Sequence, residues 1–408
     1  MFASENRIHH HIQELSKFTE TPGEGVTRLT YSKEDMQARQ YIKEKMIEYG
    51  LQVHEDGIGN IFGKLEGSKK EAPSVLIGSH FDSVPHGGAY DGTAGVVVGL
   101  EIAALFQENN IAPQYPLEII AMIEEEGTRF GDAMMGSRSI AGNISDEDLD
   151  SIQDKQGVSI REAMRECHLD SSLPRKRDSD TLKAFIEMHI EQGPILESKQ
   201  LPVGIVQSIV GLTQLDVVIK GQAGHAGTTP MHNRSDALIT ASSIITELPD
   251  IAKKESEDSV ITTGTLQVYP NGANVIPGEV TFTVDIRSSQ DQHVKNMIVE
   301  VKELVKQFQR NGIQVDIKQK TYIKPKALDP TIQQLLIDKS EKLNLEHCFM
   351  NSGAGHDAMV LSDITKAGMI FIPSENGLSH CPEEYSETYD IANSVDVIFE
   401  SVKELTNE

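Results

Sequence analysis

Short apolar runs alternate with segments of helical periodicity in the first half of this 408-residue chain. The pattern predicts strands over residues 60–65, 75–79 and 117–123, and helices over 36–49 and 93–108. Such alternation is typical of an α/β layer in which helices pack on a mainly parallel sheet. Functional groups in such sheets collect at the carboxyl ends of the strands, so we expect the site there.

From about Gly211 the pattern changes to strand, helix, strand, strand, helix, strand, and then returns to α/β character. This order is typical of a split βαβ motif. The elements expected from Gly211 onward are strands 215–220, 261–269, 279–287, 313–321 and 369–372, and helices 234–248, 294–311 and 330–343. The sequence therefore predicts an α/β domain of residues 1–210 and 323–408, with an inserted α+β domain of residues 211–322.

Composition narrows the possible partners. The net charge of −25 makes nucleic acids and anionic membranes unlikely partners, because both require basic patches. The longest apolar run, residues 95–106, is broken by Glu101 and is too short to span a bilayer. Three widely spaced cysteines and a polar N-terminal segment without an apolar core indicate a cytoplasmic protein without a signal peptide.

Histidine and acidic residues follow several of the predicted strands. His80 and Asp82 come directly after the run 75–77, and Asp91 stands just before the helix that starts at residue 93. A histidine with carboxylates at a strand end is what a divalent-metal site requires. Taken alone, His80 and Asp82 also fit a surface loop, and Asp91 also fits a helix cap.

Further candidates follow other apolar segments. Glu125 and Glu126 belong to a run of three acids at the end of the strand 117–123, where like charges repel unless cations are nearby. The run could instead be a solvated acidic turn. His189 follows an apolar patch, and His380 lies beyond the strand that ends at residue 372. Either histidine alone would more often be structural, but together with the acids they favour a metallohydrolase.

Six motifs of the chain are similar to those of the hydantoinase/carbamoylase-type amidases, within the superfamily of dinuclear zinc aminopeptidases and aminoacylases. The resemblance covers nearly the whole chain. The motifs are GSHFDS at 78–83, GGAYDG at 87–92, EEGTRF at 125–130, HIEQGP at 189–194, GHAGTTPM at 224–231 and NVIP at 274–277. The resemblance implies a zinc-aminopeptidase-like catalytic domain and a ferredoxin-like inserted domain that serves as lid and dimerisation domain.

The resemblance also implies a site for two divalent ions per subunit, either Zn or Mn, Co or Ni. Its ligands would be His80 and His189 for one ion, Glu126 and His380 for the other, and Asp91 as the bridge between them. Two close ions need a shared ligand, and a carboxylate can offer one oxygen to each.

The remaining implied roles concern catalysis. Glu125 would be the general base that takes a proton from water and returns it to the leaving nitrogen. Asp82 would orient His80, because a metal-bound histidine usually donates its other N–H to a carboxylate. His225 would stabilise the oxyanion.

Substrate-binding roles are implied for the same His225 and for four further residues. Asn274 and Arg287 would hold a carboxylate of the substrate, for which a guanidinium is well suited. Gln192 and His356 are further pocket candidates. Because the inserted domain carries the dimer contact in relatives, His225 and Asn274 would reach either their own site or that of the partner subunit.

The expected activity is hydrolysis of the carbamoyl group of N-carbamoyl-L-amino acids, a small-molecule substrate class, with release of ammonia and CO2. Allantoate, another ureido acid with a carboxylate, is the first alternative. An aminoacylase or dipeptidase activity in the same metal site is the second. A catalytically dead binding protein would have lost a ligand or the base, and all of these positions are filled.

Overall fold

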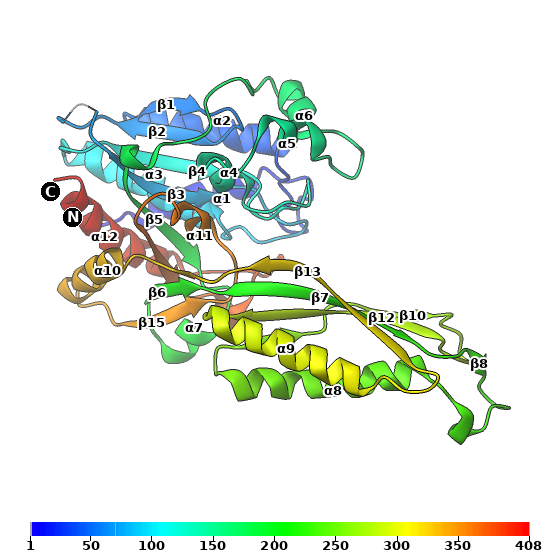
Figure 1. The fold of residues 1–408 in the computed structure, drawn as a ribbon. Coiled ribbons are helices and arrows are strands. Elements are labelled where there is room, and N and C mark those ends of the chain that lie inside the picture. The colour runs from blue at the N-terminus through cyan, green and yellow to red at the C-terminus, as the bar shows by residue number, and fades with distance from the viewer. Residues whose placement is uncertain (1, 70, 408) are drawn as a thin grey trace. The chain divides into compact units, whose positions relative to one another are not determined.

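The computed structural model describes residues 2–69 and 71–407 and divides the chain into two compact units (Figure 1). The first unit runs to Gln207 and resumes over Leu328–Met350 and from His356. The second comprises Ser208–Ala327 and Asn351–Gly355. The predicted boundaries lie within a few residues of this division, but the sequence pattern gives no sign that segment 351–355 belongs to the second unit.

Strands that lie wholly or mostly in the first unit form a mixed sheet. They are β1 (Gln52–Glu55), β2 (Ile61–Leu65), β3 (Ser74–His80), β4 (Leu117–Met122), β5 (Leu182–Ile190), β6 (Val203–Ile209), β15 (His347–Ser352) and β16 (Ala367–Ile372). The order is β1-β2-β4-β3-β5-β16-β6, and β15 also pairs with β6. The central strands β4, β3, β5 and β16 are parallel, whereas the pairs at both ends are antiparallel. The expected α/β fold is confirmed, with parallel pairing confined to the centre.

Helices pack on this sheet and around the site. They are α1 (Glu5–Ser16), α2 (Lys33–Glu48), α3 (Thr93–Glu108), α4 (Met135–Ile140), α5 (Asp146–Ser151), α6 (Ile160–Glu166), α7 (Ile195–Lys199), α10 (Pro330–Lys342), α11 (Asp357–Leu361) and α12 (Thr388–Leu405). Helix α3, which has the predicted bounds, packs on β3, β4 and β5. None of the helices in the described part of the chain is both long and apolar enough to cross a membrane.

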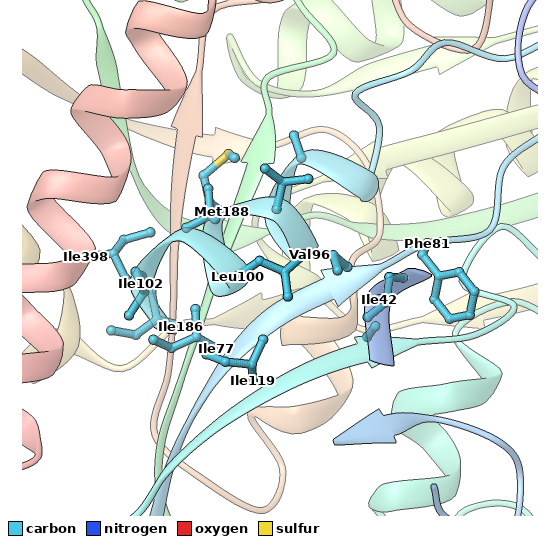
Figure 2. Packing of buried hydrophobic residues seen from close by; sticks show 14 of the residues in the cluster. Ile42, Ile77, Phe81, Val96, Leu100, Ile102, Ile119, Ile186, Met188 and Ile398 are labelled. Atoms are coloured by element: carbon cyan, nitrogen blue, oxygen red, sulfur yellow. The ribbon is translucent and has the colours of Figure 1, made fainter. Parts of the chain in front are cut away.

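Helix α3 is the centre of the hydrophobic core. It is buried from Thr93 to Phe106, as expected for a helix that is apolar all round. Figure 2 shows Val96 and Leu100 of this helix near Ile77 and Ile119 of the sheet. Glu101 is the one charge in this apolar run, and it is neutralised by Arg7, whose Nε donates to it at 2.6 Å. The rigid helix fixes the position of its N-terminus, directly after Asp91-Gly92.

The second unit is an antiparallel sheet with two helices. Its elements are β7 (Gly211–Lys220), β8 (Gly224–His225), α8 (Ala237–Glu255), β9 (Val260–Thr262), β10 (Leu266–Tyr269), β11 (Val275–Ile276), β12 (Glu279–Ser288), α9 (Asp291–Gln307), β13 (Gln314–Ile323) and β14 (Lys326–Ala327). The main sheet has the order β10-β12-β7-β13, with β9 also on β12. Helices α8 and α9 pack on each other and on this sheet. This is the expected ferredoxin-like arrangement.

Two predicted elements of the second unit differ most from the structure. The strand expected over 261–269 is split into β9 and β10, with Gly264 in the gap. The helix expected to end at residue 248 continues through Pro249 to Glu255. Pro249 is exposed, so the carbonyl freed by its missing N–H can be hydrated. The buried stripe meanwhile continues from Leu248 to Ala252, which keeps the helix on the core.

Candidate metal centre

The parallel strands deliver the candidate ligands to one edge of the sheet. His80 ends β3 and pairs in register with Met122, the last residue of β4, so the acids after β4 follow at the same edge. His189 lies near the end of β5, opposite Phe371 of β16. Asp91 lies in the loop before α3. Side chains separated by about 300 positions in sequence are thereby brought together.

Asp91 lies at the centre of the cluster. Its Oδ1 is 3.4 Å from Nε2 of His80 and 3.2 Å from Nε2 of His189. Its Oδ2 is 3.3 Å from Nε2 of His380, which is also 3.3 Å from Oε1 of Glu126. The five side chains form two groups of potential ligands that share this one carboxylate, each within reach of a single ion.

The donor set fits divalent cations. Imidazole nitrogens and carboxylate oxygens suit Zn, Mn, Co and Ni. Nε2 of His80 and Oε1 of Glu126 are buried without a hydrogen-bond partner among the described residues, although buried polar atoms are normally satisfied. Both atoms point into the cluster, so an ion there would satisfy them.

The tautomers of His80 and His189 also fit a divalent cation. Nδ1 of His80 lies 3.2 Å from the backbone carbonyl oxygen of Asp82, and Nδ1 of His189 lies 2.9 Å from that of Ile190. A carbonyl can only accept, so each Nδ1 carries the proton and each Nε2 offers a lone pair. The backbone N–H of Gly92 donates to Nε2 of His189 at 3.3 Å, which agrees with this assignment.

The expected role of Asp82, to orient His80 through its carboxylate, stays a prediction. The carboxylate oxygen is 3.6 Å from Nδ1 of His80, and the backbone carbonyl of Asp82 is closer. The carboxylate instead accepts the backbone N–H groups of Glu125 at 3.1 Å and of Glu126 at 3.3 Å. Asp82 therefore positions Glu125 and Glu126, the last two of the three acids that follow β4, and it lies next to His80 through its main-chain carbonyl.

The three consecutive acids have separate environments. Glu124 has a left-handed backbone conformation, and its carboxylate accepts the N–H groups of Arg129 and Phe130. Burial raises the pKa of Glu124 to about 7. Glu125 and Glu126 belong instead to a ligand group with His80. Burial, together with the charge of Glu126, raises the pKa of Glu125 well above its usual value, which favours a proton acceptor.

Charges within the cluster also shift the pKa values of its other members, among them Asp91 and His380. Burial opposes the charged form of Asp91, but the neighbouring histidines, His189 foremost, hold its pKa well below the usual value. The carboxylates of Asp91 and Glu126, each with an oxygen 3.3 Å from Nε2 of His380, raise the pKa of His380 to about 10. Asp91 thus stays anionic and demands positive charge, which a proton or a metal ion can supply.

Two predicted pocket residues lie beside the cluster. Nε2 of Gln192 donates to Oδ2 of Asp91 at 2.7 Å and lies 3.5 Å from Nε2 of His380. The ring of His356 is buried, with its centroid 4.4 Å from that of His189. Burial lowers the pKa of His356 well below its usual value, so the ring is neutral.

The other predicted substrate residues belong to the second unit. His225 in β8 and Asn274 are neighbours, because the backbone N–H of Ala226 donates to the carbonyl of Asn274 at 2.9 Å. Arg287 donates from Nε to Asp285 at 2.8 Å and from Nη1 to the carbonyl of Gly353 at 2.9 Å. Their substrate-binding roles remain predictions.

Two buried acids of the site are missed by the sequence analysis. Glu187 in β5 accepts the hydroxyl of Ser79 at 2.7 Å and the N–H of Ala358 at 2.8 Å. Glu384 accepts three backbone N–H groups from two loops of the site, including that of Asp91. The pattern of apolar and polar residues along β5 does not show that Glu187 is buried, because a solvent-facing glutamate would give the same pattern. For Glu384, the only signal in the sequence is that it lies in the same loop as His380.

Comparisons with known proteins cover both units. Residues 76–404 match peptidase family M20/M25/M40. The chain is 42% identical to the N-carbamoyl-L-amino-acid amidohydrolase of Paenarthrobacter aurescens, over 99% of this chain and 98% of that protein. It is 36% identical to the allantoate amidohydrolase of Bacillus subtilis, over 93% of each chain. A crystal structure of a hydantoinase/carbamoylase family amidase from Burkholderia multivorans superposes with a TM-score of 0.95 at 33% identity, covering 100% of this chain and 99% of that one.

Proposed function

This chain belongs to peptidase family M20/M25/M40 and is a hydrolase of carbon–nitrogen bonds, and from this premise we propose that it hydrolyses the carbamoyl group of N-carbamoyl-L-amino acids. The observation that carries the proposal is the pair of ligand groups that share Asp91. The substrate class rests on the activity named for the relative from Paenarthrobacter aurescens.

The metal ligands we propose are His80 and His189 at one site, Glu126 and His380 at the other, and Asp91 in both. Divalent ions held there would supply Lewis-acid chemistry, which acidifies water and polarises a carbonyl. The buried orphan atoms of His80 and Glu126 support this assignment.

Glu125 is the proposed proton carrier. It takes a proton from the attacking water, which adds to the ureido carbonyl, and it gives that proton to the terminal nitrogen as the C–N bond breaks. Ammonia leaves, and the remaining carbamic acid decomposes to CO2 and the amino acid. The raised pKa of Glu125 supports the role, because a carboxylate with a higher pKa accepts a proton more readily.

The second unit would contribute substrate recognition. We assign the substrate carboxylate to Asn274 and Arg287, and the developing oxyanion to His225. Nδ1 of His225 accepts the N–H groups of Gly227 at 3.1 Å and Thr228 at 3.2 Å, so its Nε2 carries the proton and can donate.

A homodimer through the second unit is part of the proposal. Its support is the resemblance together with exposed apolar side chains at the edge strand β10, where Leu266 is 49% and Tyr269 is 73% exposed. Dilution to a demonstrated monomer should abolish turnover if His225 and Asn274 act in the partner's site. A monomer with full activity would contradict that arrangement.

A cytoplasmic location is also proposed, and three free thiols support it.

Allantoate is the second candidate substrate, because the Bacillus subtilis relative is named for it. The deciding experiment is a substrate panel with metal-loaded protein, containing several N-carbamoyl-L-amino acids, allantoate and N-acetyl amino acids. We expect ammonia release from at least one ureido acid and the highest kcat/KM on an N-carbamoyl-L-amino acid. Activity on acetylated or peptide substrates alone would replace the proposal with an aminoacylase or dipeptidase.

A further inference from the structure

One buried carboxylate connects two loops that carry candidate metal ligands. Glu384 is only 4% exposed and follows His380 by four residues. Its Oε1 accepts the backbone N–H groups of Tyr90 and Asp91, both at 3.0 Å. Its Oε2 accepts the backbone N–H of His380 at 3.2 Å. Both oxygens are thus occupied, one by each loop.

The surroundings of Glu384 show that this position is closely fitted. A Cβ atom on Gly88 would lie 2.1 Å from Oε1 of Glu384, so the glycine leaves the space that the carboxylate occupies. His380 has a φ of 57°, in the left-handed region that is unfavourable for a histidine. Such a conformation persists only where neighbouring groups hold it, and the bond from its N–H to Glu384 is one of these.

We propose that Glu384 is a positioning residue for the second metal site, the one formed by Asp91, Glu126 and His380. It sets the separation between the two loops, and therefore the separation between Oδ2 of Asp91 and Nε2 of His380. The inference rests on the proposed function, because it takes these side chains as metal ligands. The first site depends less on Glu384, since His80 and His189 come from β3 and β5, and the hydrogen bonds described for Glu384 go instead to Tyr90, Asp91 and His380.

The conservative variant Glu384→Gln should remove the hydrogen bond to one loop and keep those to the other. Glutamine has the same shape but only one acceptor oxygen, while its amide group donates. If the oxygen stays with the two N–H groups of Tyr90 and Asp91, the amide faces the N–H of His380 and repels it. The loop of His380 then loses its support, and Asp91 keeps its place between His80 and His189.

The experiment is calorimetric titration of metal-free protein with Zn²⁺, checked by elemental analysis. Wild-type protein and the control Glu383→Gln, an exposed neighbour with the same charge change, should bind two ions. Glu384→Gln should bind the first ion with wild-type affinity and the second at least about tenfold more weakly. Co²⁺ titrations should show the same difference in the visible spectrum of the second ion.

Glu384→Asp is the second variant. It keeps the charge but is one methylene shorter, so it cannot reach both loops, and we expect the same selective loss. Two ions bound with wild-type affinity in both variants would overturn the inference, and so would equal weakening of both ions in folded protein. Wild-type protein that binds fewer than two ions would instead refute the proposed two-metal function.

Discussion

The carboxylate of Asp82 accepts the backbone N–H of Glu125 at 3.1 Å. The second oxygen of the same carboxylate accepts the N–H of Glu126 at 3.3 Å. Glu125 and Glu126 are therefore both fixed through their main chain by one buried side chain. The proposed base and the proposed ligand differ in role but share this support.

Asp82→Asn should reduce kcat/KM roughly 10- to 100-fold while the protein stays folded. The asparagine side chain has one acceptor oxygen for two N–H groups, so one of the two acids loses its support. Steady-state hydrolysis of an N-carbamoyl-L-amino acid and a thermal melt would measure both properties. Asp178→Asn, an exposed position, is the control and should behave as wild type. An unchanged kcat/KM in Asp82→Asn would refute the role.

The same change from glutamate to glutamine, made separately at Glu125 and at Glu126, distinguishes the proposed base from the proposed metal ligand. We expect Glu125→Gln to keep both ions and lose roughly 10²- to 10⁴-fold in kcat, because proton transfer is lost. Glu126→Gln should lose one ion. Metal content and kcat of both variants, measured on the same preparation, give the answer. A Glu125→Gln variant with near-normal turnover would remove Glu125 as the base.

Gly92→Ala should weaken metal binding, because the new Cβ would lie 2.3 Å from Nε2 of His80. Gly157→Ala is the matched control, since Gly157 also has a positive φ, +83°, but nothing lies within 4 Å of its Cβ position. The control should cost only backbone strain, about 1–2 kcal/mol. Unfolding free energy and zinc affinity should be measured for both. Equal zinc affinity in the two variants would show that the His80 ring tolerates displacement.

Stability should fall between pH 6.5 and about 4 because of His11. Its buried ring lies between the hydroxyls of Tyr41 at 2.7 Å and Tyr49 at 2.9 Å, and burial lowers its pKa from 6.5 to about 4. In this window the unfolded chain binds a proton that the folded protein excludes. The stabilisation is therefore complete above pH 6.5 and is lost as the pH falls, by up to about 1.4 kcal/mol per pH unit.

The test of the His11 effect is urea unfolding across this pH range. His11→Gln can bond to both tyrosines without titrating, so its stability should change less with pH than that of wild type. His10→Gln, at an exposed neighbour, should retain the wild-type slope. Equal slopes in His11→Gln and wild type would assign the pH dependence to other groups.

The sequence identifies the side chains that enter the cluster better than those that support it. His80 directly ends an apolar run, and parallel pairing brings it to the same edge as the acids after β4. The support from Glu384 depends on a contact with Asp91, 293 residues away. The carboxylate oxygens of Glu384 accept backbone N–H groups, which every residue except proline carries. The contact therefore cannot be predicted from the types of residue in the sequence. The sequence likewise gives no sign that the carboxylate of Asp82 accepts the backbone N–H groups of Glu125 and Glu126.

The parallel pairing of β5 with β16 has a consequence for biosynthesis. β5 is complete once Ile190 has been made, but its partner strand starts only at Ala367, after the whole second unit. At 5–20 residues per second, the nascent chain exposes this strand edge for about 10 to 35 s. An unpaired strand edge can form hydrogen bonds with a strand of another chain, which leads to aggregation. Heterologous yield should therefore depend on translation speed and chaperone supply through this interval, even when the finished protein is stable.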